Sequence, residues 1–197
     1  VTGVSGSGKS TLLEAIAIAW GFNPEGGSIN FSFSTRDSHS DLHDVIRLSR
    51  ATERPRDGYF FRAESYFNVA TEIERLDAEP GGGAPIIDSY GGRSLHEQSH
   101  GESFWALFME RFGGNALYIL DEPEAALSPT RQMAMLTRIH DLVKMKSQFI
   151  IATHSPILMA YPNAKILQIA DDGLREVRYT ETEYYAVTKE FLKRHER

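Results

Sequence analysis

A glycine-rich segment at the start of the chain constrains the fold more than any other stretch. Residues 3–11 read Gly-Val-Ser-Gly-Ser-Gly-Lys-Ser-Thr, so four residues separate Gly3 from Gly8 and Lys-Ser follows. Apolar residues then recur at helical spacing, at Leu12, Leu13, Ile16 and Ala17. A flexible linker would not run straight into such a repeat. We therefore interpret the segment as a loop that feeds a helix and binds phosphate groups through backbone N–H groups and the positive end of the helix dipole.

The residue types in this loop suit the phosphates of a nucleotide. Glycine at positions 3, 6 and 8 allows the backbone to wrap closely around them. Lys9 would place its charge on the β- and γ-phosphates, and the Ser10 hydroxyl would ligate Mg²⁺. The predicted nucleotide-binding residues of the loop are Gly3, Ser5, Gly6, Ser7, Gly8, Lys9, Ser10 and Thr11.

Two further segments place acids and a histidine at the ends of apolar runs. Residues 116–120 are typical of a strand buried on both faces, and Asp121 and Glu122 follow. Beside the phosphate loop, Asp121 would reach Mg²⁺ and Glu122 would polarise an attacking water as general base. His154 follows the next apolar run, where it would contact the γ-phosphate and orient the water. The predicted catalytic residues are Glu122, His154 and Lys9, and the predicted metal ligands are Ser10 and Asp121.

Helical and extended patterns alternate along the chain. We expect helices over about 8–19, 66–76, 99–112 and 130–145, one that begins near Ser40 or Asp41, and a closing helix around 184–191. We expect strands over 29–33, 59–61, 116–120 and 149–152, and a hairpin over 165–179. In the helix over 130–145, the predicted buried face carries Met133, Leu136, Ile139 and Leu142 or Val143. Strands that alternate with helices around a phosphate loop predict a three-layer α/β fold.

The composition is that of one ordinary folded domain. Of the 197 residues, 41% are hydrophobic and 24% are charged, which is enough to build a core. The absence of cysteine excludes disulfides, thiolate metal sites and thiol catalysis. A net charge of −6 gives no basic footprint for general nucleic-acid binding, and no apolar run approaches the ~20 residues of a membrane span. We expect a cytoplasmic protein with no membrane span.

The chain resembles the ATP-binding-cassette (ABC) class of ATPases at four places. They are the loop at 3–11, the segment 117–123, the Glu-Ala-Ala-Leu-Ser run at 124–128, and His154. The run Asp-Glu-Pro-x-x-x-Leu looks like the Mg²⁺ strand of that class followed by its dimer-contacting loop, although Ser128 stands where the family usually has Asp. The resemblance implies a three-layer P-loop NTPase fold of the ABC type, with a mostly parallel core sheet and a small helical/β subdomain. It also implies ATP and Mg²⁺ as cofactors, and hydrolysis of ATP to ADP and phosphate.

That family carries a Leu-Ser-Gly-Gly-Gln signature before the Mg²⁺ strand, and residues 98–103 read Gln-Ser-His-Gly-Glu-Ser at this place. Ser99 and Gly101 match the signature, whereas Glu102 is among the departures from it. The resemblance implies that Ser99, Gly101 and Glu102 grip the γ-phosphate of ATP held by a second subunit, so that two chains form a homodimer around two ATP molecules. The Ser-His-Gly-Glu variant is similar to that of small bacterial stand-alone proteins described as predicted AAA-family or ABC-like ATPases.

The same resemblance predicts the organisation of the chain. One ABC-type ATPase domain spans 1–197, with an inserted β/helical region over 28–98, a β-hairpin over 165–179 and a C-terminal helix over 183–195. The fold normally has a buried strand before the phosphate loop, and since only Val1 and Thr2 precede it here, we expect that N-terminal strands are missing from this sequence.

Residue 64 or 65 falls where the family keeps a γ-phosphate-sensing Gln, and this chain has Glu64 and Ser65 there. A second motif, His96-Glu97-Gln98-Ser99-His100, matches the zinc-protease pattern His-Glu-x-x-His. Glycines on both sides of it disfavour one continuous helix, so we expect no zinc.

Other functions stay open from the sequence. They are a nucleic-acid-associated repair or defence ATPase, an ATP-gated dimerisation switch with little turnover, and a P-loop kinase. Each is compatible with an unidentified protein or nucleic-acid partner.

Overall fold

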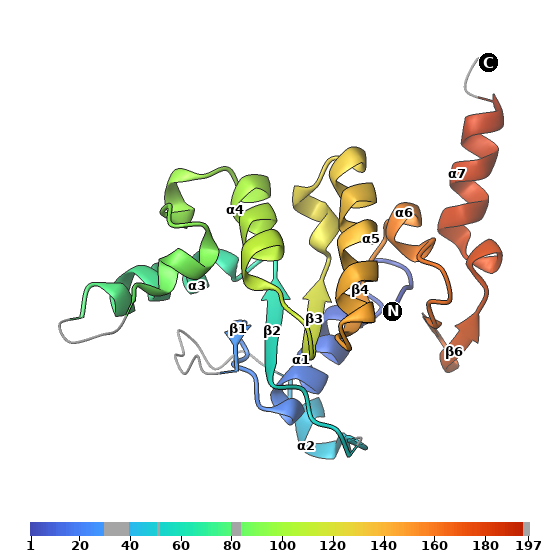
Figure 1. The fold of residues 1–197 in the computed structure, drawn as a ribbon. Coiled ribbons are helices and arrows are strands. Elements are labelled where there is room, and N and C mark those ends of the chain that lie inside the picture. Colours follow the sequence, from blue (N-terminus) through green and yellow to red (C-terminus); the bar gives the residue numbers. More distant parts are fainter. Residues whose placement is uncertain (30–39, 51, 80–83, 195–197) are drawn as a thin grey trace.

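A computed structural model of the protein describes residues 1–29, 40–50, 52–79 and 84–194. Its centre is a four-stranded sheet (Figure 1). In sheet order the strands are β1 (Gly27–Ser28), β2 (Asp57–Arg62), β3 (Ala116–Asp121) and β4 (Gln148–Ala152). β2, β3 and β4 run parallel, and β1 pairs antiparallel with β2. The sheet is therefore mostly parallel, as predicted.

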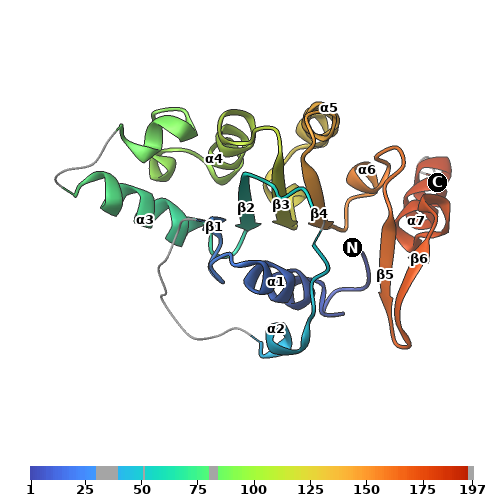
Figure 2. The same ribbon diagram turned by 60° about the horizontal axis from the view of Figure 1, so that its bottom comes forward.

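Helices cover both faces of this sheet (Figure 2). On one face lies α1 (Lys9–Trp20), with the short α2 (Leu42–Val45) packed against it. The other face is covered by α3 (Tyr66–Asp77), α4 (His100–Ala106), α5 (Pro129–Lys144) and α6 (Pro156–Met159). These three layers form the P-loop NTPase fold that the sequence predicts.

Alternation of side chains along the central strands builds one apolar core on each face. Phe61 and Leu120 belong to the larger core under α3, α4 and α5. Phe60 and Ile119 belong to the smaller core, where they meet Leu13 of α1. All six residues of β3 are buried, which explains why residues 116–120 form an uninterrupted apolar run.

The C-terminal part lies beyond β4 and contains a separate two-stranded sheet. It consists of the hairpin β5 (Ile166–Ala170) and β6 (Gly173–Val177), followed by α7 (Glu183–Arg194). The Val1 oxygen accepts from Thr153 N at 3.1 Å, and Thr2 forms a parallel bridge with Gln168. The residues just before the phosphate loop therefore lie between β4 and β5.

Short helical turns connect several of these elements. They are the 3₁₀ turns η1 (Ile86–Tyr90), η2 (Leu95–Glu97), η4 (Pro123–Ala126) and η5 (Tyr179–Glu181), and the π-helical segment η3 (Leu107–Arg111) that continues α4.

Most predicted elements are confirmed, including the helices over 66–76 and 130–145 and the strand over 116–120. The predicted strand over 29–33 falls almost wholly on residues outside those described. The predicted insert over 28–98 contains β2, which is a central strand of the main sheet. Part of the predicted insert therefore belongs to the main sheet. The rest of the predicted domain organisation stays a prediction.

The predicted buried face of α5 is wrong at Met133, whose exposed fraction is 55%. The buried stripe instead runs through Met135, Ile139 and Leu142. Met133 lies two residues before Met135, a rotation of about 200° around the helix, which turns its side chain to the solvent.

An ion pair joins the start of β2 to the π-helical segment. Arg111 Nη2 donates to Asp57 Oδ1 at 2.9 Å, and Arg111 Nη1 contacts Asp57 Oδ2. Burial raises the pKa of Asp57, but the hydrogen bonds and charge of Arg111 outweigh burial and hold the pKa below its usual value. The pair therefore favours the folded state while Asp57 is ionised.

We expect Asp57→Asn to lower the free energy of unfolding at pH 7 by about 1 kcal/mol, a value reduced for the partial exposure of the pair. Because the folded pKa lies below the unfolded one, this contribution is present above about pH 4 and is lost as the pH falls through the folded pKa. Urea denaturation of both proteins across pH 7 to pH 3 measures it. An equal difference at every pH would contradict this assignment.

Candidate functional site

The glycine-rich loop lies at the N-terminus of α1, at the carboxyl ends of the parallel strands. Gly6 and Gly8 have φ of +77° and +89°, in the left-handed region that favours glycine. A Cβ at Gly3 would lie 2.7 Å from Ser7 Oγ and 3.0 Å from the Ile169 backbone oxygen, so a side chain here would be crowded. The sequence therefore folds here into a tight turn that its glycines favour.

The Lys9 side chain is folded into this loop. Its Nζ lies 3.1 Å from the Val4 oxygen and 3.4 Å from the Gly3 oxygen, and Lys9 is only 4% exposed. Ser7 Oγ is buried without a hydrogen-bond partner in the part of the chain that the structure describes. A buried ammonium and an unpartnered hydroxyl inside a loop of backbone amides are suited to an anionic group such as a phosphate. Ser5 of the same loop is exposed, and so is Thr11 in the first turn of α1.

Ser10 and Asp121 come together at the end of β3. Ser10 Oγ donates to Asp121 Oδ1 at 3.1 Å. Burial raises the pKa of Asp121 to about 6, while the Ser10 hydrogen bond and the Arg62 charge oppose that rise. A buried carboxylate with a raised pKa is stabilised by a cation.

The two oxygens fit Mg²⁺. Mg²⁺ prefers oxygen ligands at about 2.0–2.1 Å in octahedral geometry, which sets adjacent ligands about 3 Å apart. The separation of Ser10 Oγ from Asp121 Oδ1 matches that spacing. These residues would hold Mg²⁺ with water and phosphate oxygens as further ligands.

Glu122 and His154 form a second pair, one residue beyond Asp121. Glu122 N donates to the Ala152 oxygen at 3.0 Å, which ties the end of β3 to the end of β4. Glu122 adopts φ of +49°, a left-handed conformation that is uncommon for Glu. His154 Nε2 lies 3.0 Å from Glu122 Oε1. The structure thus brings the predicted base next to the predicted histidine.

Tyr184 of α7 holds the other side of the imidazole. Its hydroxyl contacts His154 Nδ1 and also lies 3.2 Å from the Gly3 oxygen of the phosphate loop. The hydroxyl donates its single proton to the Gly3 oxygen, so the Tyr184 oxygen faces His154 Nδ1 as an acceptor. The sequence suggested Tyr184 only as a position in a closing helix, because nothing local links it to residues 3 or 154.

Glu124 is a further residue that the sequence did not single out as functional. Its Oε1 accepts from Thr153 Oγ1 at 2.7 Å, His154 N at 2.6 Å and Ser155 N at 3.2 Å. The carboxylate therefore fixes the backbone that carries His154. Glu124 lies in the run that resembles the dimer-contacting loop of ABC ATPases, and that resemblance did not predict a role for it within its own chain.

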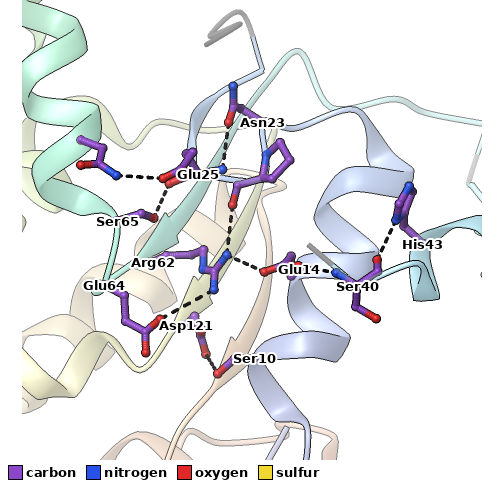
Figure 3. A network of polar contacts seen from close by, with 12 residues as sticks. Ser10, Glu14, Asn23, Glu25, Ser40, His43, Arg62, Glu64, Ser65 and Asp121 are labelled. Atoms are coloured by element: carbon purple, nitrogen blue, oxygen red, sulfur yellow. Dashed lines mark hydrogen bonds and ion pairs between the residues drawn. The ribbon is translucent and has the colours of Figure 1, made fainter. Parts of the chain in front are cut away.

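Glu14 and Arg62 are also new to the site (Figure 3). They form an ion pair beside Ser10 and Asp121, and Arg62 Nη2 lies 3.8 Å from Glu64 Oε2. The Glu64 side chain is 90% exposed. Ser65, the alternative at this position, instead contacts the Glu25 oxygen through its hydroxyl.

Ser99, Gly101 and Glu102 lie apart from the phosphate loop of the same chain. Ser99 caps α4, which covers the face of the sheet opposite to α1 (Figure 2). Ser99 and Glu102 form a capping box, with Ser99 Oγ 2.6 Å from Glu102 Oε2. A Cβ at Gly101 would lie 2.4 Å from the Ala126 oxygen, so glycine is needed where α4 meets η4. Their contact with ATP of a second subunit stays a prediction.

The zinc-protease pattern is divided between two elements. His96 lies in η2 and His100 begins α4, as expected from the flanking glycines. His96 Nε2 contacts Thr71 Oγ1 at 3.2 Å and the ring packs on Phe67. Among the described residues, no group of three or more His, Cys, Asp or Glu side chains is arranged to hold a metal ion.

Comparison with known proteins gives two matches. Residues 86–160 match the family described as "AAA domain, putative AbiEii toxin, Type IV TA system". A protein described as "ABC transporter G family member STR2", from Medicago truncatula, is 27% identical over 170 residues, which cover 79% of this chain. The chain is similar to ABC-like and AAA-type P-loop ATPases. The match spans only 23% of the length of the transporter protein.

The similarity to such proteins suggests nucleotide binding, and the glycine-rich loop is the candidate site for it. No helix in the described ranges combines the length and apolar character needed to cross a bilayer. The catalytic and metal-binding roles of individual side chains stay predictions.

We expect Glu124→Ala to lower the free energy of unfolding by about 2–3 kcal/mol, because it leaves two backbone amides and a hydroxyl without their shared acceptor. Glu124→Gln keeps an acceptor oxygen and should lose about half as much or less. Urea denaturation of the three proteins measures the difference. If the alanine and glutamine variants were equally stable, Glu124 would not act through these hydrogen bonds.

Proposed function

We propose that this ABC-like P-loop domain binds ATP with Mg²⁺ and hydrolyses it to ADP and phosphate. One observation supports this most strongly. Segments far apart in the sequence meet at one edge of the sheet. There Lys9 lies inside the loop, Ser10 donates to Asp121, and His154 contacts Glu122. A phosphate-binding loop, a pair of hard oxygen ligands and a carboxylate base are the parts that this hydrolysis requires.

The residues of the loop would bind and orient the triphosphate. Lys9 would turn from its carbonyl contacts to the β- and γ-phosphates, and the backbone amides of residues 6–10 would hold the phosphate oxygens. When bound, Mg²⁺ neutralises charge on the phosphate oxygens, and Ser10 and Asp121 would hold it.

Glu122 would act as the general base. Its carboxylate is half-exposed at the end of β3, where a water molecule can reach it. It would take a proton from the water that attacks the γ-phosphorus, while ADP leaves with the β-phosphate oxygen. His154, held by Tyr184, would orient Glu122 in the arrangement seen here, and on ATP binding its Nε2 side would turn to the γ-phosphate and the attacking water.

A homodimer would complete the site. Ser99 and Glu102 are exposed at the start of α4, on the other face of the sheet from the loop. By the resemblance to ABC ATPases, this segment of one chain would contact the γ-phosphate bound to a second chain. Turnover would then require two copies.

We expect Glu122→Gln to keep ATP binding and to slow hydrolysis by at least about 100-fold, because the amide cannot accept the proton. The trapped protein should accumulate as an ATP-bound dimer. Phosphate release, binding of a fluorescent ATP analogue and light scattering after size-exclusion chromatography measure these effects.

Lys9→Ala is the matched control and should lose ATP binding itself. Hydrolysis by Glu122→Gln at the wild-type rate would exclude Glu122 as the base. ATP-dependent dimerisation of the wild-type protein without phosphate release would instead indicate a dimerisation switch.

A further inference from the structure

Beside the Ser10–Asp121 pair lies a second polar pair, one turn further along α1. Residues four apart share a helix face, so Ser10 meets Asp121 at the end of β3 and Glu14 meets Arg62 at the end of β2 (Figure 3). Arg62 and Asp121 are paired residues of these parallel strands. Two carboxylates, one guanidinium and one hydroxyl therefore form a single layer between α1 and the sheet.

The Glu14 side chain holds the Arg62 guanidinium toward α1. Glu14 is 7% exposed, and its Oε2 accepts from Arg62 Nη1 while its Oε1 accepts from Ser40 N at 3.3 Å. The same Nη1 donates to the Pro24 oxygen at 3.2 Å. No ion pair joins Arg62 to Asp121 among the described residues.

A different pairing is available to this guanidinium. Adjacent strands lie about 4.8 Å apart, so the Arg62 side chain is long enough to reach the carboxylate of its neighbour Asp121. Arg62 Nε is buried without a hydrogen-bond partner in the described part of the chain, which leaves a donor for another acceptor. The planar guanidinium matches a carboxylate in a two-point contact. Such a contact would occupy the oxygens that a metal ion needs.

We propose that Glu14 is a positioning residue that holds Arg62 away from Asp121 and so keeps the Asp121 carboxylate open to Mg²⁺. This inference rests on the proposed function, because it takes Ser10 and Asp121 as the ligands of the ion that accompanies ATP. Arg62 still acts on Asp121 from its present place, since its charge opposes the effect of burial on the pKa of that carboxylate. Glu14 thus keeps the positive charge of Arg62 near Asp121, and it prevents the guanidinium from contacting the Asp121 carboxylate directly.

The test is the Mg²⁺ concentration that half-saturates binding of a fluorescent ATP analogue. In Glu14→Gln the guanidinium loses its buried counter-charge and keeps only the distant, solvent-exposed Glu64, so it turns to Asp121 and this concentration should rise by about tenfold. Binding of the analogue in EDTA depends on the loop alone and should stay within about twofold of wild type. A thermal unfolding scan of each variant shows that it is folded.

The double variant Glu14→Gln/Arg62→Gln separates positioning from a general loss of structure. Without a guanidinium to compete, the half-saturating Mg²⁺ concentration should return to within about threefold of wild type. Asp57→Asn is the matched control, because it removes the carboxylate partner of another arginine at the opposite end of β2. It should leave the Mg²⁺ dependence unchanged.

The inference would be overturned if the half-saturating Mg²⁺ concentration were unchanged in Glu14→Gln. It would also be overturned if that concentration rose as much in the double variant as in the single one. Where Glu14→Gln does not fold, Glu14→Asp retains the charge on a side chain one methylene shorter. It should raise the half-saturating concentration by about threefold, and no rise would equally overturn the inference. If the folded wild-type protein bound ATP equally well with and without Mg²⁺, the proposed function itself would be contradicted.

Discussion

The contact of α1 with the carboxyl ends of the parallel strands is the interaction on which the rest of the structure depends. Leu13 is fully buried against Phe60 and Ile119, which contributes about 2 kcal/mol through removal of its side chain from water. That apolar contact fixes the rotation of the helix. Because the rotation is fixed, Ser10 and Glu14 face the strand ends, where they meet Asp121 and Arg62.

A second set of contacts holds the candidate site from the C-terminal side. Glu124 gathers the backbone amides of His154 and Ser155, and Tyr184 contacts both His154 and Gly3. The hairpin of β5 and β6 brings α7 to this edge through the bridge between Thr2 and Gln168. The imidazole is therefore held by segments that are about 30 residues apart or more in sequence.

The segment around Ser99 is organised differently. Its capping box satisfies the N-terminus of α4, and the close approach of Gly101 to Ala126 couples that helix to the loop after β3. The same loop carries Glu124, which orients the backbone of His154. A contact made at Ser99 by another molecule would therefore be separated from the candidate site by one layer of packed residues. This supports the proposed role of a second copy in completing the site.

The sequence by itself determined the local elements and marked the residues of the candidate site. Glycine spacing predicted the loop before α1, the apolar run predicted the buried β3, and the Asp-Glu doublet marked its end, because each is a short-range pattern of sterics and burial. Only the tertiary structure decided that Met135 rather than Met133 is buried, since helix rotation follows from packing. It alone brought Glu14 to Arg62, Glu124 to His154 and Tyr184 to Gly3, because hydrogen bonds between distant segments leave no periodic trace in the sequence.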